Sequence, residues 1–265
     1  MKSSPMLADL IEISRFAGVH PQWVQGGGGN CSVKDQNKMW VKASGCFLEE
    51  VSVDQGYAVV DAKTGQPLDE EYGKASMETP LHTLLGSFVI HTHPVLVSAY
   101  VSSYEAKNQF KELFPESPFV WVDYATPGKK LFEKVKATIP AAAAQNDLVL
   151  FLENHGLFVS SALKKKAMDL HQEVLFRLQS FFGDPQKLPE IDPGKCLTPD
   201  HAVYGLSSTG NLSGKGKIAR DETLLAVKQA LACIAQKGWS PRWISQGEVD
   251  LLLKMDEEKY RQARL

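Results

Sequence analysis

The sequence has few cysteines and no long apolar run. Its four cysteines among 265 residues include no Cys-x-x-Cys pair and are too sparse for a disulfide framework. Even the apolar run at 148–152 ends at Glu153, well short of the roughly 20 residues that cross a bilayer. The first residues lack the continuous apolar stretch of a signal peptide, because Asp9 and Glu12 interrupt it. We therefore expect a soluble, cytoplasmic protein with reduced thiols and no membrane partner.

The sequence also lacks a surplus of charge. Lys and Arg number 29 against 31 Asp and Glu, a formal net charge of −2, so we expect no basic surface for a nucleic-acid backbone. Neither a P-loop nor a G-x-G-x-x-G fingerprint occurs, and we expect no nucleotide or NAD. Hydrophobic residues make up 43% of the chain, close to the average for globular proteins, which predicts a buried core.

Hydrophobic periodicity and turn residues predict strands intermixed with helices. The predicted strands cover 31–34, 39–45, 56–61, 88–93, 119–122, 148–152, 157–159 and 202–204. The predicted helices cover 6–17, 78–85, 95–114, 129–138, 162–181, 221–237 and 246–263, with a flexible loop at 207–217. Because hairpins lie among these elements, we expect an α/β fold with a mixed or antiparallel sheet and helices on its faces.

His91 and His93 have the spacing of a metal-ligand pair. Side chains two apart on a strand point the same way, so both imidazoles can reach one ion. Taken alone, His-x-His is also compatible with two ordinary histidines in a polar strand.

His155 and Glu78 extend this pair. His155 comes directly after a predicted buried strand, where a turn at the sheet edge can aim a third imidazole inward. Three histidines with an open fourth position are typical of a catalytic divalent-metal site. Glu78, at the start of a predicted helix, is a candidate fourth ligand or base beside the metal; its alternative role is to cap the helix.

The segments 26–30 and 42–45 form a second constellation. The first reads Gly-Gly-Gly-Gly-Asn and the second Lys-Ala-Ser-Gly. Glycines let successive backbone amides converge on an anion, and serine hydroxyls add donors. The segments predict a phosphate cradle, with a mobile glycine turn as the alternative.

Taken together, these motifs resemble the class II aldolase/adducin family, which includes fuculose- and rhamnulose-phosphate aldolases. The resemblance covers about residues 6–182. It rests on Gly29-Asn30-x-Ser32, Lys42-Ala43-Ser44-Gly45, Ser76-Met77-Glu78, His91-Thr92-His93-Pro94, Tyr124-Ala125-Thr126-Pro127-Gly128 and Asn154-His155-Gly156, in this order. It implies a three-layer α/β/α sandwich with a central mixed, largely antiparallel sheet. It also implies a metal-dependent enzyme that forms a homo-oligomer, usually a tetramer with active sites between subunits.

The resemblance also implies roles for individual residues. The zinc ligands would be His91, His93 and His155; Mn²⁺, Co²⁺ and Fe²⁺ suit three imidazoles as well. Glu78 would be the acid/base, and Tyr124 would reach a neighbouring subunit's site as a proton donor. The residues that would hold the substrate phosphate are Gly29, Asn30, Ser44, Gly45 and Ser76. Met77 stands where family phosphate loops often have a second serine, so the charge of the ligand stays open.

These roles predict a zinc-dependent aldolase of carbohydrate metabolism that cleaves a small ketose phosphate or related sugar acid through a metal-stabilised enediolate. A decarboxylase or a dehydratase in the same family would use the same groups, whereas Glu78 disfavours an epimerase, which often carries Asp there. A non-catalytic adducin-like module would be expected to lose metal ligands. We predict a catalytic domain at 1–185 and a helical extension at 186–265 packed on the same unit.

Four further histidines lie outside these motifs. His201 is predicted at the surface or a strand edge, with a substrate contact as the alternative, and His20 and His171 are predicted at the surface. His82 lies one helical turn after Glu78, where it can either support the site or pack in the core.

Overall fold

The structure is a computed structural model that describes residues 4–116, 118–140, 142, 146–185, 187–206 and 214–264. Within these residues, eight strands form one sheet in the order β4-β3-β2-β1-β5-β8-β7-β6. Neighbouring strands are antiparallel except β6 and β7, which are parallel. The strands are β1 (Asn30–Lys34), β2 (Lys38–Lys42), β3 (Tyr57–Asp61), β4 (Pro67–Asp69), β5 (Phe88–Thr92), β6 (Phe119–Val122), β7 (Leu148–Leu152) and β8 (Gly156–Ser161). The predicted mixed, largely antiparallel sheet is confirmed.

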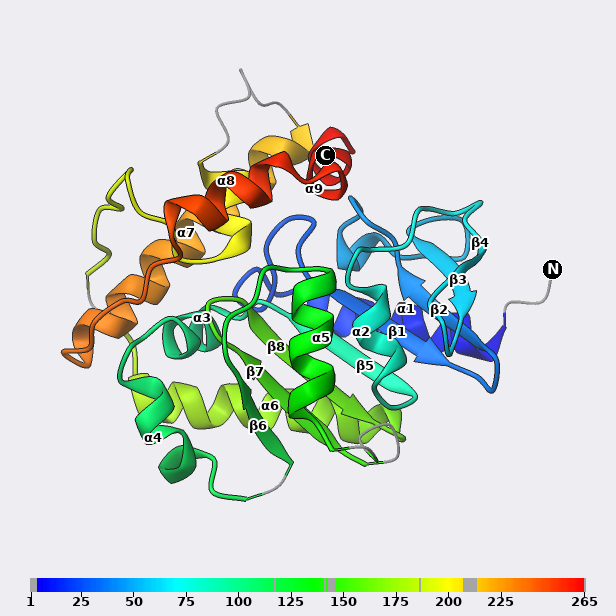
Figure 1. Ribbon diagram of the computed structural model, residues 1–265, viewed down its shortest axis with the longest axis horizontal. Helices are drawn as coiled ribbons and strands as arrows, with labels where there is room; N and C mark the ends of the chain where they lie inside the picture. The colour runs from blue at the N-terminus through cyan, green and yellow to red at the C-terminus, as the bar shows by residue number, and fades with distance from the viewer. Residues whose placement is uncertain are drawn as a thin grey trace.

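Helices cover both faces of this sheet, as Figure 1 shows. One face is covered by α1 (Pro5–Gly18), α3 (Val95–Val101) and α6 (Lys164–Phe182). The other face is covered by α2 (Thr79–Thr83) and α5 (Lys129–Thr138). The remaining helical segments of the described residues are η1 (Leu48–Glu50), α4 (Ala106–Leu113), η3 (His201–Gly205), α7 (Gly214–Gln236), α8 (Gln246–Lys254) and α9 (Asp256–Ala263). The arrangement confirms the three-layer α/β/α sandwich.

Strand β7 shows why the sequence folds into three layers. Its Leu-Val-Leu-Phe-Leu run is buried at every position, because helices shield both faces of the sheet. Leu150 packs with the side chains under α2 and α5. Its neighbours Val149 and Phe151 pack in the larger core on the opposite face. Adjacent residues of one strand thus contribute to two cores, since successive side chains point to opposite faces.

The predicted single helix at 95–114 is wrong, because the chain divides it into α3 and α4. Between them, the carbonyl of Ser102 accepts a hydrogen bond from the amide of Arg242 (2.6 Å), and the amide of Tyr104 donates to the carbonyl of Ser240 (3.1 Å). The segment near residue 240 therefore forms hydrogen bonds with backbone groups that a continuous helix would pair internally.

Three predictions near the C-terminus also need correction. The apolar residues 202–204 lie in the π-helix η3 and not in a strand, since a short buried apolar run does not distinguish the two. In the predicted loop, 207–213 lie outside the described residues, and 214–217 begin helix α7. The predicted helix at 246–263 is divided at Met255, whose backbone is extended (φ −64°, ψ 130°).

The C-terminal extension, residues 186–265, contacts the sandwich over much of its described length. Apolar side chains of α7 belong to the same core as those of α3. The division into a domain at 1–185 and an extension remains a prediction.

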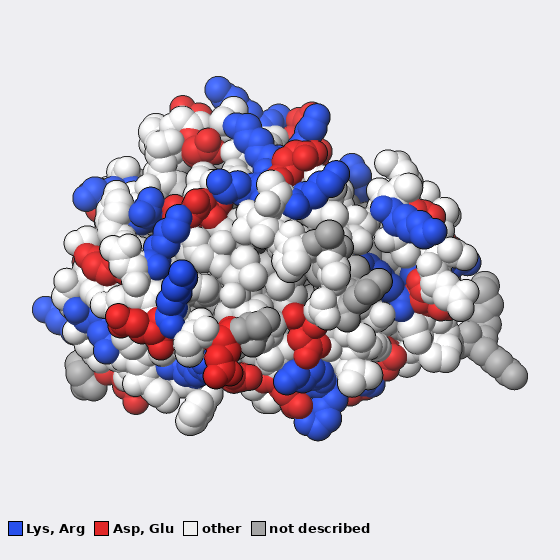
Figure 2. All heavy atoms as spheres, turned by 60° about the horizontal axis from the view of Figure 1, so that its bottom comes forward, with Lys and Arg blue, Asp and Glu red and all other residues white. Residues whose placement is uncertain are grey.

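Of the helices in the described part of the chain, none combines the length and apolar character that crossing a bilayer requires. On the face shown in Figure 2, Lys and Arg lie among Asp and Glu.

Candidate metal centre

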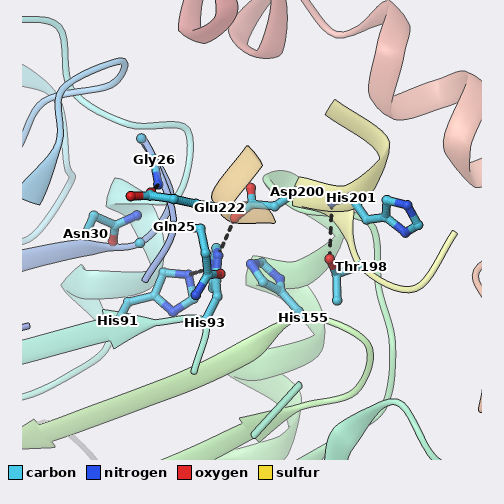
Figure 3. Close-up of polar contacts among 12 residues, drawn as sticks. Gln25, Gly26, Asn30, His91, His93, His155, Thr198, Asp200, His201 and Glu222 are labelled. Atoms are coloured by element: carbon cyan, nitrogen blue, oxygen red, sulfur yellow. Dashed lines mark hydrogen bonds and ion pairs between the residues drawn. The ribbon is translucent and has the colours of Figure 1, made fainter. Parts of the chain in front are cut away.

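Three buried imidazoles meet at one edge of the sheet, as Figure 3 shows. His91 is in β5, and His93 directly follows this strand, so alternation places both rings on the same side. His155 ends the tight turn between β7 and β8. One nitrogen of each ring lies within 4.8 Å of the others. Asn154 precedes His155 with a φ of 53°, a left-handed conformation that asparagine tolerates, and so turns the chain toward the site.

Hydrogen bonds fix which nitrogen of two rings faces the centre. Nδ1 of His91 lies 2.9 Å from the carbonyl oxygen of Leu157, and Nδ1 of His93 lies 2.5 Å from Oδ2 of Asp200. Both oxygens act as acceptors, so Nδ1 of each ring carries a proton and Nε2 is the nitrogen that faces the centre. These two Nε2 atoms lie 3.0 Å apart. Burial lowers the pKa of His91 to about 4, which keeps this ring in the neutral, metal-binding form.

Glu78, the residue directly before α2, faces the same point. Its Oε2 lies 3.3 Å from Nε2 of His91, and its Oε1 lies 3.2 Å from Nε2 of His155. Burial alone would raise the pKa of this carboxyl group, but the neighbouring His91 and His155 outweigh burial and hold the pKa well below its usual value. Glu78 is therefore ionised at neutral pH.

This donor set fits a divalent cation. Two imidazole Nε2 atoms that lie 3.0 Å apart beside a buried carboxylate form a donor set that a positive charge would stabilise. Oε1 of Glu78 has no hydrogen-bond partner within the described residues. Nitrogen and carboxylate donors are the ligands that zinc and its neighbours in the first transition row accept.

A hydrogen-bonded chain behind Glu78 holds its carboxylate. The amide Nδ2 of Asn30 donates to Oε2 of Glu78 over 2.9 Å. Oδ1 of Asn30 accepts a short hydrogen bond from Nε2 of His82, and Nδ1 of this ring accepts from the hydroxyl of Ser32 over 2.8 Å. Burial lowers the pKa of His82 to about 3, so the ring is neutral. His82 thus supports the site through Asn30.

A small cavity of about 30 Å³ adjoins the cluster, with room for roughly two waters. It is lined by four of the five predicted phosphate-binding residues, which are Gly29, Asn30, Ser44 and Ser76. The fifth, Gly45, lies against helix α9, where an added Cβ would stand 2.4 Å from Cβ of Arg264. The extension closes the cavity with Pro199, Asp200, Glu257, Glu258 and Arg261.

Lys42 is a cavity residue to which sequence reasoning gave no role of its own. Its ammonium group donates to the carbonyls of Gly27 (2.8 Å) and Gly29 (3.2 Å). Burial lowers its pKa to about 8, so it remains largely charged at pH 7. The sequence feature that could have identified Lys42 is its place in the Lys-Ala-Ser-Gly motif. Lys42 fixes the shape of the glycine loop and adds a cation to the cavity.

Tyr124 lies away from this cavity. Its ring packs against a buried apolar cluster of the extension that includes Ala202 and Val249, and its hydroxyl has no hydrogen-bond partner within the described residues. Burial raises the pKa of this hydroxyl. Its predicted role in a neighbouring subunit's site remains a prediction.

Two other histidines predicted at the surface are buried. Nε2 of His171 lies 2.8 Å from the hydroxyl of Thr92, and Nδ1 of His201 accepts from the amide of Leu197 over 3.1 Å. Both predictions are wrong because these polar rings find hydrogen-bond partners inside the fold. Sequence reasoning also missed Asp200, although it considered the adjacent His201.

Comparisons with known proteins relate this fold to one family. A family model described as the class II aldolase and adducin N-terminal domain matches residues 8–179. The N-terminal class II aldolase domain of a conserved protein from Thermoplasma acidophilum is 22% identical with a TM-score of 0.58, and the match covers 68% of this chain and 95% of that one. No match was found among curated proteins.

Two further solved structures are similar. An aldolase II superfamily protein from Pseudomonas syringae is 15% identical with a TM-score of 0.55, covering 98% of both chains. An L-fuculose 1-phosphate aldolase is 22% identical with a TM-score of 0.52, covering 72% of this chain and 93% of that one. At these identities the similarity concerns the fold.

Proposed function

Because this chain belongs to the class II aldolase and adducin family, we propose that it is a metal-dependent aldolase that cleaves a carbon–carbon bond in a small ketose phosphate or related sugar acid. The observation that carries the proposal is the cluster of three imidazoles, two of which lie within 3.3 Å of the carboxylate of Glu78. The family contains adducin-like modules without catalytic activity, and retention of this complete donor set favours an enzyme.

The proposed metal ligands are His91, His93 and His155, with Glu78 as a further ligand or a base beside them. We propose Zn²⁺, and the same donors also suit Mn²⁺, Co²⁺ or Fe²⁺. When bound, such an ion supplies Lewis-acid stabilisation of the negative charge that develops on substrate oxygens as the bond breaks.

Glu78 is the proposed group for proton transfer at the donor carbon. Cleavage takes one proton from the hydroxyl on the carbon that becomes the aldehyde and adds one to the donor carbon. In the condensation direction the ionised carboxylate accepts the proton from that carbon, and in cleavage the protonated acid returns it. The Asn30 amide, which donates to Oε2, keeps the carboxylate oriented toward the cluster. Tyr124 of a neighbouring subunit is proposed to serve the aldehyde oxygen.

The end of the cavity at Lys42 favours an anionic group of a small, polar substrate, whereas Glu257 and Glu258 line the side formed by the extension. Lys42 supplies a positive charge, and the hydroxyls of Ser44 and Ser76 supply donors. Met77 lines the same cavity without a donor, so a carboxylate or a phosphate can occupy this end. A cavity of about 30 Å³ does not hold a ketose, and we expect α9 to move when substrate binds. The predicted tetramer and cytoplasmic location belong to this proposal.

A substrate screen tests the proposal. Metal-loaded protein is incubated with phosphorylated and free ketoses and with keto acids, and products are scored as aldehyde, carbon dioxide or loss of water. We expect aldehyde release that stops when a chelator removes the metal. Carbon dioxide or dehydration products would instead identify a decarboxylase or dehydratase. Metal-independent binding without turnover would identify a scaffold module.

A further inference from the structure

Asp200 joins the C-terminal extension to the histidine cluster. Its Oδ2 lies 2.5 Å from Nδ1 of His93, and its Oδ1 accepts from a guanidinium nitrogen of Arg261 over 2.9 Å. The side chain is almost completely buried. Asp200 lies outside residues 8–179, which match the family domain. A residue of the extension thus contacts a proposed metal ligand directly (Figure 3).

The contact with Asp200 determines the tautomer and the ring orientation of His93. A carboxylate that accepts from Nδ1–H fixes the tautomer and the rotation of the ring and makes Nε2 a stronger donor. His93 then directs Nε2 toward His91, 3.0 Å away. Without this carboxylate the ring could rotate about its Cβ–Cγ bond or adopt the other tautomer.

The glycine loop leaves room for this contact. A Cβ added to Gly28 would stand 2.6 Å from Oδ2 of Asp200 and 3.1 Å from Nδ1 of His93, so any larger residue would separate the pair. Helix α7 of the extension fixes the same loop, because Glu222 accepts from the amide of Gly26 over 2.8 Å. The glycine loop and the extension therefore pack closely around Asp200 and His93.

Arg261 holds the carboxylate in place. Its guanidinium lies over the ring of Tyr204, with 4.9 Å between the guanidinium carbon and the ring centroid, and Nε lies 2.8 Å from Oε2 of Glu258. Both oxygens of Asp200 thus have a donor, because Oδ2 accepts from Nδ1 of His93 and Oδ1 accepts from Arg261.

We propose that Asp200 is a positioning residue that orients His93 for metal binding, and that Arg261 anchors Asp200, so that the C-terminal extension completes the metal centre. The inference rests on the proposed three-histidine metal site, and it is independent of which reaction the site catalyses.

Metal binding by full-length variants tests the proposal. Asp200→Asn keeps the volume of the side chain but cannot accept on both atoms, because one of them becomes an amide nitrogen that only donates. Asp200→Glu retains two acceptor oxygens. Glu105→Gln is the matched control, since Glu105 holds the extension through the amide of Ser240 at 3.0 and 3.1 Å without touching the centre. Zn²⁺ affinity is measured by competition with a chelator, and the visible spectrum of the Co²⁺-loaded protein reports ligand geometry.

We expect Asp200→Asn to lower Zn²⁺ affinity about 10- to 100-fold and to alter the Co²⁺ spectrum. Asp200→Glu is expected to retain part of the Zn²⁺ affinity and a spectrum nearer to that of the wild type. Glu105→Gln is expected to leave the affinity and the spectrum unchanged. Arg261→Met is expected to weaken Zn²⁺ binding by a smaller factor than Asp200→Asn. If Asp200→Asn does not fold, the Zn²⁺ affinity of Arg261→Met tests the proposal. Wild-type affinity and spectrum in Asp200→Asn, or in Arg261→Met where the former does not fold, would overturn the proposal. A wild-type protein that binds Zn²⁺ but cleaves no ketose would refute the proposed reaction alone.

Discussion

The side-chain amide of Asn30 donates a hydrogen bond of 2.9 Å to the carboxylate of Glu78, and both side chains are buried. Asn30 begins β1, and Glu78 immediately precedes α2. The contact gives a residue predicted to bind phosphate a second task, the orientation of the proposed acid/base. The first two predictions follow from it.

Replacing Glu78 with Gln removes the ionisable group with little change in shape. Turnover should fall by a factor on the order of 10² or more, and the protein should retain its metal because three imidazoles remain. Steady-state kinetics together with elemental analysis measure both effects, with the exposed Glu49→Gln as control. Unaltered turnover would remove Glu78 from the chemistry.

Replacing Asn30 with Ala leaves Oε2 of Glu78 and Nε2 of His82 without their present partner. A buried polar group that loses its partner costs about 1–3 kcal/mol, so the free energy of unfolding should decrease by at least that amount. Urea denaturation measures the change. A variant as stable as wild type would show that this chain of hydrogen bonds contributes little.

Acid should destabilise the protein through its buried neutral histidines. Burial lowers the pKa of His171 to about 3, whereas the unfolded value is near 6.5. Between these values the unfolded chain binds more protons than the folded one, so stability is present above pH 6.5 and is lost as the pH falls. His171 alone should account for a loss of about 2 kcal/mol between pH 7 and pH 5.

His171→Gln tests this contribution, because glutamine keeps a polar group near Thr92 but does not titrate. Unfolding free energies at pH 7 and pH 5 should differ less in the variant than in wild type, by about 2 kcal/mol. An equal loss in both proteins would show that His171 does not stay neutral in the folded state.

Gly28→Ala probes the space between the glycine loop and the extension. The new methyl group would stand 2.6 Å from Oδ2 of Asp200, so one of the two must move and Zn²⁺ affinity should fall. Gly247→Ala is the control, because the nearest atom to its added Cβ is 4.0 Å away. Equal chelator competition by the two variants would contradict the tight fit.

Much of the fold follows from local patterns. The alternation of β5 placed His91 and His93 on one side, and the apolar run of β7 placed His155 at the sheet edge. These inferences need only strand periodicity and the position of a turn.

Other features depend on contacts between distant segments. His93 and Asp200 are 107 residues apart, and no pattern in either segment indicates the pairing. The break between α3 and α4 likewise depends on the chain near residue 240, and His171 is buried because Thr92 of β5 offers it a partner. Tertiary hydrogen bonds of this kind override local propensity.

The central claim is that three imidazoles hold one divalent cation, and the metal content of His93→Ala tests it most directly. After both proteins are loaded with Zn²⁺ and dialysed, elemental analysis should find about one ion per chain in the wild type and little in the variant. A wild type without zinc, or a variant with its full content, would contradict the account.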